Sequence, residues 1–337
     1  MQPDRAVRTW CLRSAAGGVL IWLLYLILDR ASGWNYITII ERLLLLAILV
    51  FTPLALALVQ QWPAHQAPNR ILGWACRLQP LAALLVAVAF TQPTGNLAAS
   101  LTFPWLLCAG MVALAGLAMR RTAHGAHPPH ELVLTIGMLY LPIGAAWLLI
   151  SRLGLRPLAF PDVIVLLTAV HFHYTGFAVP VITAMTGRFL ARQQRVVPLY
   201  PWIAGAIVGA TPLIAAGITL APWLEALGVL LIFLAVCGLA GVLIIHVLPR
   251  LSSAVARGLL TIAACAMVVA ILPALLYGTG ELLGRSFITI PRMVQIHGFT
   301  NAFGFVACGF SGWLVAGTGT GGQFGPCRED SVVVKTT

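Results

Sequence analysis

Charged side chains are scarce in this chain of 337 residues. Asp, Glu, Lys and Arg together make up 9% of it, whereas a soluble globular domain carries about 25%. Hydrophobic residues make up 60%, and the mean hydropathy is +0.95. Long polar stretches are missing too, because only short connections separate the apolar runs. These shortages exclude a water-soluble globular enzyme and indicate a protein embedded in a membrane.

Cysteine motifs and internal repeats are also lacking. The seven cysteines contain no C-x-x-C pair and fall mostly within apolar runs, which predicts small packing residues and no disulfide framework. The segments HFHYTGF and HGFTNAFGF are weakly alike. A similarity this short does not establish the inverted repeats that many transporters contain.

The apolar runs themselves predict the fold class. Each run can cross a hydrocarbon layer of roughly 30 Å as a helix, the default structure where the backbone must satisfy its own hydrogen bonds. We predict an all-α, polytopic helical transmembrane bundle of about ten spans. They are expected near residues 15–33, 37–59, 70–90, 97–118, 131–150, 161–185, 198–219, 223–247, 255–277 and 293–316. Nine spans are the alternative, because only LAPW (Leu220 to Trp223) separates the seventh from the eighth.

The same pattern predicts the domain organisation. Residues 1–14 are expected to be a cytoplasmic N-terminal segment, 15–317 a single transmembrane helical domain, and 318–337 a disordered cytoplasmic tail. Basic residues precede the first span, but no small-residue cleavage site follows it clearly. We therefore expect a retained helix that also serves as the insertion signal.

The distribution of basic residues predicts the orientation. Of the twenty Lys and Arg, a ten-span layout with the N-terminus inside places fourteen inside and six outside. This asymmetry follows the positive-inside rule, so both termini are expected in the cytoplasm and the chain in the cell membrane. The net charge of +11 is thereby assigned to topology and the lipid bilayer, with no nucleic-acid partner. The six outer residues are Arg30, Arg42, Arg152, Arg156, Arg285 and Arg292, and the expected interfacial tryptophans are Trp34, Trp105 and Trp223.

One apolar segment, TAVHFHYTGFAVPVI, contains His171, His173 and Tyr174. The sixth span descends from the outside near Pro161, so His171 should lie about 15 Å deep, close to the midplane. An ionisable group at that depth is costly and normally faces the bundle interior with a partner. Some of these three side chains are therefore expected to line an internal site.

Other spans bring polar groups to compatible depths in the outer half. Glu41 lies in the second span, and His297 and Asn301, four residues apart, share one face of the tenth. Glu225 and Glu281 are secondary candidates near the outer ends of the eighth and ninth spans. The inner half has only Arg77 and His246 at comparable positions. The pattern predicts a polar pocket that opens outward and has no path inward.

Helical geometry restricts which side chains can meet. His171 and His173 are about 200° apart on a regular helix, so they point to opposite sides, and His171 shares its face with Tyr174. Pro180 cannot bond back to the preceding turn, so a kink could bring both rings toward one cavity. The alternative for His173 is a packing hydrogen bond to a carbonyl of a neighbouring helix.

Three segments resemble the YndJ-like family of bacterial membrane proteins: ERLLLLAILVFTPLAL from Glu41, HFHYTGFAVP from His171, and HGFTNAFGF from His297. The likeness extends from the second span to the last. The family resemblance implies a polytopic membrane protein and supports Glu41, His171, His173, Tyr174, His297 and Asn301 as one shared site. It names no reaction and no substrate.

Two classes of function fit these residues. The first is an intramembrane enzyme performing acid–base chemistry (isomerisation, cyclisation or hydration) on a lipophilic small molecule, without a cofactor. Glu41 would exchange protons with His171 or His297 as partner, while Tyr174 and Asn301 would polarise a substrate oxygen. In a variant of this enzyme, a divalent transition metal would be held by His171, His173, His297 and Glu41. The second class is a proton-coupled transporter or exporter that uses the same groups as a relay.

Overall fold

The computed structural model describes residues 3–28, 36–61, 69–122 and 128–318. Within these ranges all regular secondary structure is helical, and ten helices are long and apolar enough to cross a membrane. The first five spans are α1 (Pro3–Leu28); α2 (Tyr36–Leu46) with η2 (Ala47–Phe51) and α3 (Thr52–Gln61); α4 (Arg70–Phe90); α5 (Asn96–Thr122); and α6 (Pro129–Leu153). The predicted all-α fold is confirmed.

The last five spans follow a short 3-10 turn, η3 (Pro157–Ala159). They are α7 (Asp162–His173) with η4 (Tyr174–Ala178) and α8 (Val179–Arg192); α9 (Tyr200–Leu220); α10 (Pro222–Val242) with η5 (Leu243–Val247) and η6 (Leu248–Arg250); α11 (Ala254–Leu283); and α12 (Ile290–Met293) with η7 (Val294–Gly298), η8 (Thr300–Ala307) and α13 (Cys308–Thr318). The nine-span alternative was wrong, because the extended backbone of Ala221 (φ −167°, ψ 134°) ends α9. The tail predicted at 318–337 lies, beyond Thr318, outside the described residues.

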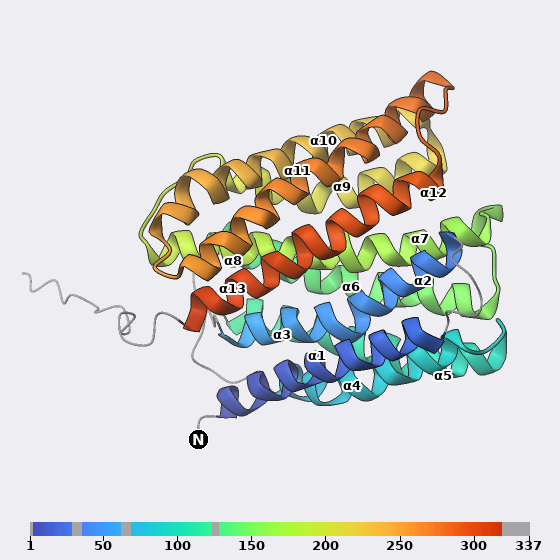
Figure 1. Ribbon diagram of the computed structural model, residues 1–337, viewed down its shortest axis with the longest axis horizontal. Helices are drawn as coiled ribbons and strands as arrows, with labels where there is room; N and C mark the ends of the chain where they lie inside the picture. Colours follow the sequence, from blue (N-terminus) through green and yellow to red (C-terminus); the bar gives the residue numbers. More distant parts are fainter. Residues whose placement is uncertain (1–2, 29–35, 62–68, 123–127, 319–337) are drawn as a thin grey trace, which may run out of the picture.

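The helices run side by side along the long axis of the molecule (Figure 1). α10 packs against both α9 and α11 at one side, and α4 packs between α1 and α5 at the other. The second span, Ile39–Gln61, lies in the centre, since 89% of its apolar window is buried. An apolar segment so enclosed by neighbouring helices, rather than lipid, can contribute residues to an internal site.

Several spans contain π-helical turns, in which one extra residue per turn displaces backbone carbonyls from their usual partners. Nearby side chains bond such carbonyls in η2: Gln79 Nε2 donates to Ile48 O at 2.8 Å, and Thr52 Oγ1 donates to Ala47 O at 2.9 Å. Insertions of this type are frequent at functional sites. Two others, η4 and η7, flank the pocket described below.

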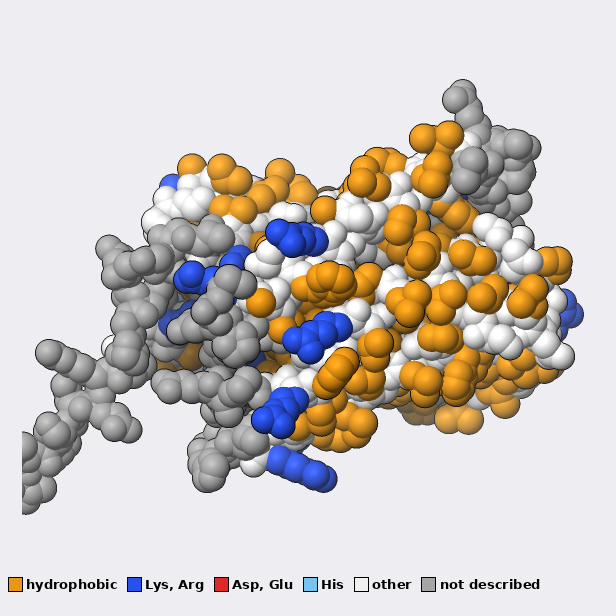
Figure 2. Space-filling model, turned by 90° about the horizontal axis from the view of Figure 1, so that it is seen from below, with side chains coloured by type: hydrophobic (Ala, Val, Ile, Leu, Met, Phe, Trp, Pro, Cys, Tyr) orange, Lys and Arg blue, Asp and Glu red, His pale blue; other side chains and the backbone are white. Residues whose placement is uncertain are grey.

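We call the end of the bundle at which α7 begins the α7 end, and the end at which α8 finishes the α8 end (Figure 1). On the face in Figure 2, Lys and Arg side chains gather toward the end at which α1 begins, and hydrophobic side chains cover most of the rest. This is the α8 end, which the charge asymmetry predicts to be cytoplasmic. The orientation itself stays a prediction.

Some residues predicted at the membrane surface lie inside the bundle instead. Trp105 was expected to be an interfacial anchor, but its side chain is 0% exposed because α5 packs against α4 and α6. Trp223 is 62% exposed at the start of α10, as an anchor would be, while Trp34 lies outside the described residues. Arg42 and Arg152, assigned to outer connections, are both buried.

Candidate functional site

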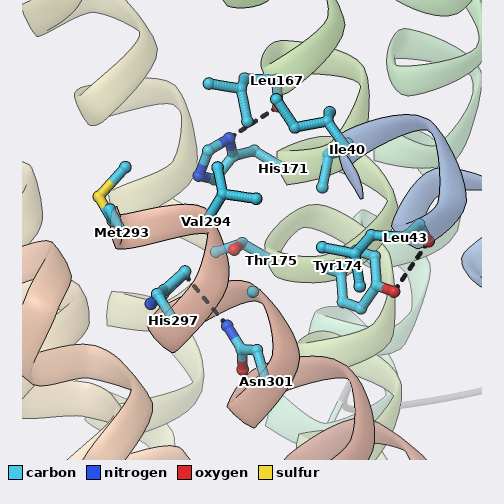
Figure 3. A pocket seen from close by; sticks show the side chains of 12 residues that line it. Ile40, Leu43, Leu167, His171, Tyr174, Thr175, Met293, Val294, His297 and Asn301 are labelled. Carbon is cyan, nitrogen blue, oxygen red and sulfur yellow. Dashed lines mark hydrogen bonds between the residues drawn. The ribbon is translucent and has the colours of Figure 1, made fainter. Parts of the chain in front are cut away.

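A pocket lies in the half of the bundle toward the α7 end, where α2, α7 with η4, and α12 with η7 and η8 meet (Figure 3). It measures about 500 Å³ when the open space at its mouth is included. Four of the predicted site residues line it, namely His171, Tyr174, His297 and Asn301. The remaining lining residues are Ile40, Leu43, Leu167, Val170, Thr175, Met293, Val294 and Gly298. The wall is therefore mostly apolar and has a few polar groups.

His171 presents one ring nitrogen to this pocket. Its Nδ1 lies 2.7 Å from Leu167 O, and because a carbonyl oxygen only accepts, the proton must be on Nδ1. The other nitrogen, Nε2, has no partner among the described residues, and the side chain is exposed. In Figure 3 the ring borders the open space beside Val294. Nε2 is thus an accessible proton acceptor, and the bond from Nδ1 to Leu167 O fixes the orientation of the ring.

His297 has both ring nitrogens bonded. Nδ1 donates to Ala270 O of α11 at 2.6 Å, and Nε2 accepts from Asn301 Nδ2 at 3.2 Å, one turn along the same span. With Nδ1–H on Ala270 O and Nε2 accepting from Asn301, His297 is neutral in this arrangement. The predicted proximity of His297 and Asn301 on one helical face is present in the structure.

Tyr174 belongs to the pocket wall, but its hydroxyl is directed away from a ligand. The hydroxyl donates to Leu43 O of α2 at 2.9 Å, and the ring packs edge-on against Phe51 with centroids 5.9 Å apart. Its proton is therefore used to join η4 to the second span. Tyr174 positions the wall rather than polarising a substrate oxygen.

The structure directs His173 away from the pocket. Its Nδ1 donates to Ala169 O at 2.7 Å, its Nε2 accepts from Trp105 Nε1 at 3.1 Å, and the two rings stack at 18°. Gly144 of α6 makes room, since a Cβ there would lie 2.8 Å from His173 Nδ1. The π turn begins only after His173, so the angle between the two histidines is that of a regular helix. His173 thus packs between helices, but its partner on the neighbouring helix is the Trp105 indole and its carbonyl partner belongs to its own helix.

Replacing Trp105 with phenylalanine tests this packing role. The Trp105→Phe change removes the donor to His173 Nε2 and is expected to lower the free energy of unfolding by about 1 kcal/mol, the usual size of such bonds between membrane helices. Thermal unfolding of purified protein in detergent measures the change. Trp223→Phe, at an exposed tryptophan, is the control and should leave stability unaltered. Equal losses in both variants would contradict a specific Trp105–His173 interaction.

The acidic candidates also lie apart from the pocket lining. Glu41 forms an ion pair with Arg152 (Oε1 to Nη2, 3.7 Å), and the Arg152 guanidinium lies over the Phe90 ring at 4.6 Å. Glu225 opens α10 and Glu281 lies near the end of α11, where the two carboxyl groups are electrostatic neighbours. Glu41 therefore balances a buried cation, and neither Glu225 nor Glu281 reaches the pocket lining.

The four residues considered as metal ligands are divided among three places. His171 and His297 line the pocket, His173 contacts Trp105, and Glu41 contacts Arg152. Across the part of the chain that the structure describes, no three His, Cys, Asp or Glu side chains form a group able to hold a metal ion. The predicted set is thus not assembled as one coordination sphere.

One buried ion pair was missed by the sequence reasoning. Arg188 of α8 donates from Nε and Nη2 to the two carboxylate oxygens of Glu131 of α6, at 2.6 and 2.7 Å. The Arg188 side chain is only 3% exposed, because α8 continues to Arg192 and places it one turn inside the bundle. Arg188 had been assigned to a connection, so the expectation of only Arg77 and His246 in the half that holds this pair did not include it. The available signal was a Glu and an Arg near the adjoining ends of consecutive spans.

A ten-span helical bundle with a histidine-lined pocket in one half defines a multi-pass integral membrane protein. The chain belongs to the YndJ-like protein family, whose model matches residues 42–305 and so includes every pocket residue except Ile40. A relative is the uncharacterized membrane protein YndJ of Bacillus subtilis (strain 168), 29% identical over 279 residues. The match covers 83% of this chain and 49% of the relative, so the chain spans about half of that protein's length. No solved structure matches.

Proposed function

We propose that this chain is an intramembrane enzyme that performs acid–base chemistry on a lipophilic small molecule in the cell membrane, with His171 as the proton-transferring group. The observation that carries the proposal is the His171 ring, with Nδ1–H held by Leu167 O and Nε2 unbonded at the wall of an apolar pocket. Histidine exchanges protons near neutral pH, and general acid–base catalysis requires one such nitrogen within reach of the substrate.

The proposed chemistry uses this chain's own residues. His171 Nε2 would take a proton from a bound molecule and return it at another atom, as an isomerisation, cyclisation or hydration requires. Leu167 O would keep its bond to Nδ1–H throughout, stabilising the imidazolium that forms. Across the pocket from His171 lie His297 and Asn301. Ala270 O holds the His297 ring, and His297 in turn holds the Asn301 amide. Apolar neighbours such as Leu167, Val170 and Val294 would exclude water and bind the hydrocarbon part.

Comparing lipid extracts would test the proposal. A host that lacks the gene is supplied with wild-type protein, His171→Asn or His246→Asn, and its lipid-soluble compounds are compared by mass spectrometry. We expect one compound to be lost and its precursor to accumulate only with His171→Asn. The two compounds should have equal masses after an isomerisation or cyclisation, and masses that differ by one water after a hydration. His246 lies on η5 and outside the pocket lining, so its variant should behave as wild type. Identical extracts from all three, at equal protein levels, would contradict the proposal.

A proton-coupled transporter is the second candidate, and the Glu131–Arg188 pair favours it. The sixth span carries His171 in its first half, a π turn in its middle and Arg188 near its far end. Titratable groups on both sides of a helix break are typical of relays in moving elements.

Proton flux distinguishes the two candidates. The protein is reconstituted in vesicles that contain a pH-sensitive dye, and a potassium gradient with valinomycin supplies the driving potential. The enzyme proposal predicts no flux above protein-free vesicles. Flux that disappears in His171→Asn and in Glu131→Gln, compared at equal amounts of folded protein, but persists in His246→Asn, would replace the enzyme with the transporter.

A further inference from the structure

Nε2 of His171 and the hydroxyl of Thr175 lie one helical turn apart in the pocket, and neither has a partner among the described residues. Other threonines on the same span bond back to a carbonyl four residues earlier, as Thr168 does to Ile164 O at 2.8 Å and Thr183 to Val179 O at 2.8 Å. Thr175 lies instead in the π-helical η4, and its oxygen faces the cavity between His171 and His297 (Figure 3). Threonine hydroxyls in a membrane normally find a bond, so these two groups together point to a ligand.

Among the described residues that line the pocket there is no Asp, Glu, Lys or Arg. Glu41, which follows the lining residue Ile40 in the chain, is paired with Arg152, and the His297 ring is neutral in its bonds to Ala270 O and Asn301. A carboxylate, phosphate or ammonium group would therefore lose its hydration without gaining a fixed counter-charge, which is costly in an apolar site. The lining favours an uncharged ligand.

One neutral group satisfies both free positions at once. A hydroxyl can donate its hydrogen to His171 Nε2 and accept a hydrogen bond from the Thr175 hydroxyl, whereas an ether oxygen can only accept. Resting on the proposed function, we infer that the substrate is an uncharged lipophilic alcohol, bound with its hydroxyl between His171 and Thr175 and its hydrocarbon part against Leu167, Val170, Met293 and Val294. Thr175 is then a substrate-binding residue that determines specificity.

Photolabelling tests the inference without requiring turnover. Purified wild-type protein in detergent is irradiated with an eight-carbon alcohol carrying a diazirine, and in parallel with its methyl ether and the corresponding carboxylate. Labelled residues are located by mass spectrometry. We expect saturable labelling of the peptides containing Leu167–Val170 and Met293–Val294 by the alcohol, at concentrations about tenfold lower than for either analogue, because each analogue loses a hydrogen bond or adds a charge.

Two variants place the hydroxyl within the pocket. Thr175→Val keeps the shape of the side chain and is expected to weaken labelling by the alcohol about tenfold, whereas Thr168→Val, whose hydroxyl bonds Ile164 O, should leave it unchanged. Equal labelling by the alcohol, ether and carboxylate, or undiminished labelling of Thr175→Val, would overturn the inference, as would absence of labelling in the pocket. These results are separable from the lipid-extract test: alcohol binding with no His171-dependent product would leave the alcohol-binding site standing and remove the enzyme.

Discussion

His171→Asn is expected to turn over the enzyme's substrate about 10²–10⁴ times more slowly than wild type, the usual contribution of a general acid–base group. Asparagine retains a polar side chain but cannot exchange a proton near neutral pH. The measurement is the single-turnover rate of purified protein on the compound that accumulates in lipid extracts. The acid limb of the pH–rate profile should also disappear, because the group whose protonation stops the reaction is gone.

His173→Asn is the matched comparison, since it alters a histidine only two residues away. Its ring bonds Ala169 O and Trp105 and does not line the pocket. We expect it to lower the fraction of folded protein while leaving the rate per folded molecule within about tenfold of wild type and the acid limb intact. A rate loss in His173→Asn equal to that in His171→Asn, with folding retained, would show that the pocket assignment is wrong.

The second large effect is expected on stability. Glu131→Gln removes the carboxylate that accepts two bonds from Arg188 and leaves that guanidinium, 3% exposed, without its counter-charge. Removing one partner of a buried pair destabilises proteins by about 3–5 kcal/mol, because the remaining charge is desolvated and uncompensated. Thermal unfolding in detergent should show a Tm lower by roughly 10 °C.

Asp162→Asn provides a control with nearly identical geometry. Arg156 binds both carboxylate oxygens of Asp162 at 2.7 and 2.6 Å, but both side chains are more than 60% exposed at the α7 end. When Asp162 loses its charge, water still solvates the exposed Arg156 guanidinium, so there is no desolvation cost and Tm should barely change. Equal shifts in Asp162→Asn and Glu131→Gln would show that burial is not what makes the Glu131–Arg188 pair matter.

Composition and periodicity were sufficient for the architecture. A run of apolar residues must satisfy its own backbone hydrogen bonds in lipid, so the number of helices and most of their positions follow from local sequence alone. The first was misplaced, since α1 spans Pro3–Leu28 and includes most of the segment 1–14 that was expected to precede a span at 15–33. Depth follows as well, because each residue advances a helix by a fixed rise of about 1.5 Å. That is why His171, Tyr174, His297 and Asn301, from spans six and ten, could be placed in one layer and are found around one pocket.

Rotation about each helix axis was decided only by tertiary packing. The rotation of α2 about its own axis decides whether the Glu41 side chain points into the pocket or toward Arg152 of α6. No local pattern in the sequence specifies that angle. His173 faces Trp105 because Gly144 lets α6 approach that side of α7, a contact between residues far apart in the sequence. Likewise, Glu131 and Arg188 are 57 residues apart, and they meet because α6 and α8 pack together. The sequence by itself determined the helices and the layer that the polar residues of spans six and ten share, whereas the pairing of side chains required the packed bundle, since partners are chosen across helices rather than along them.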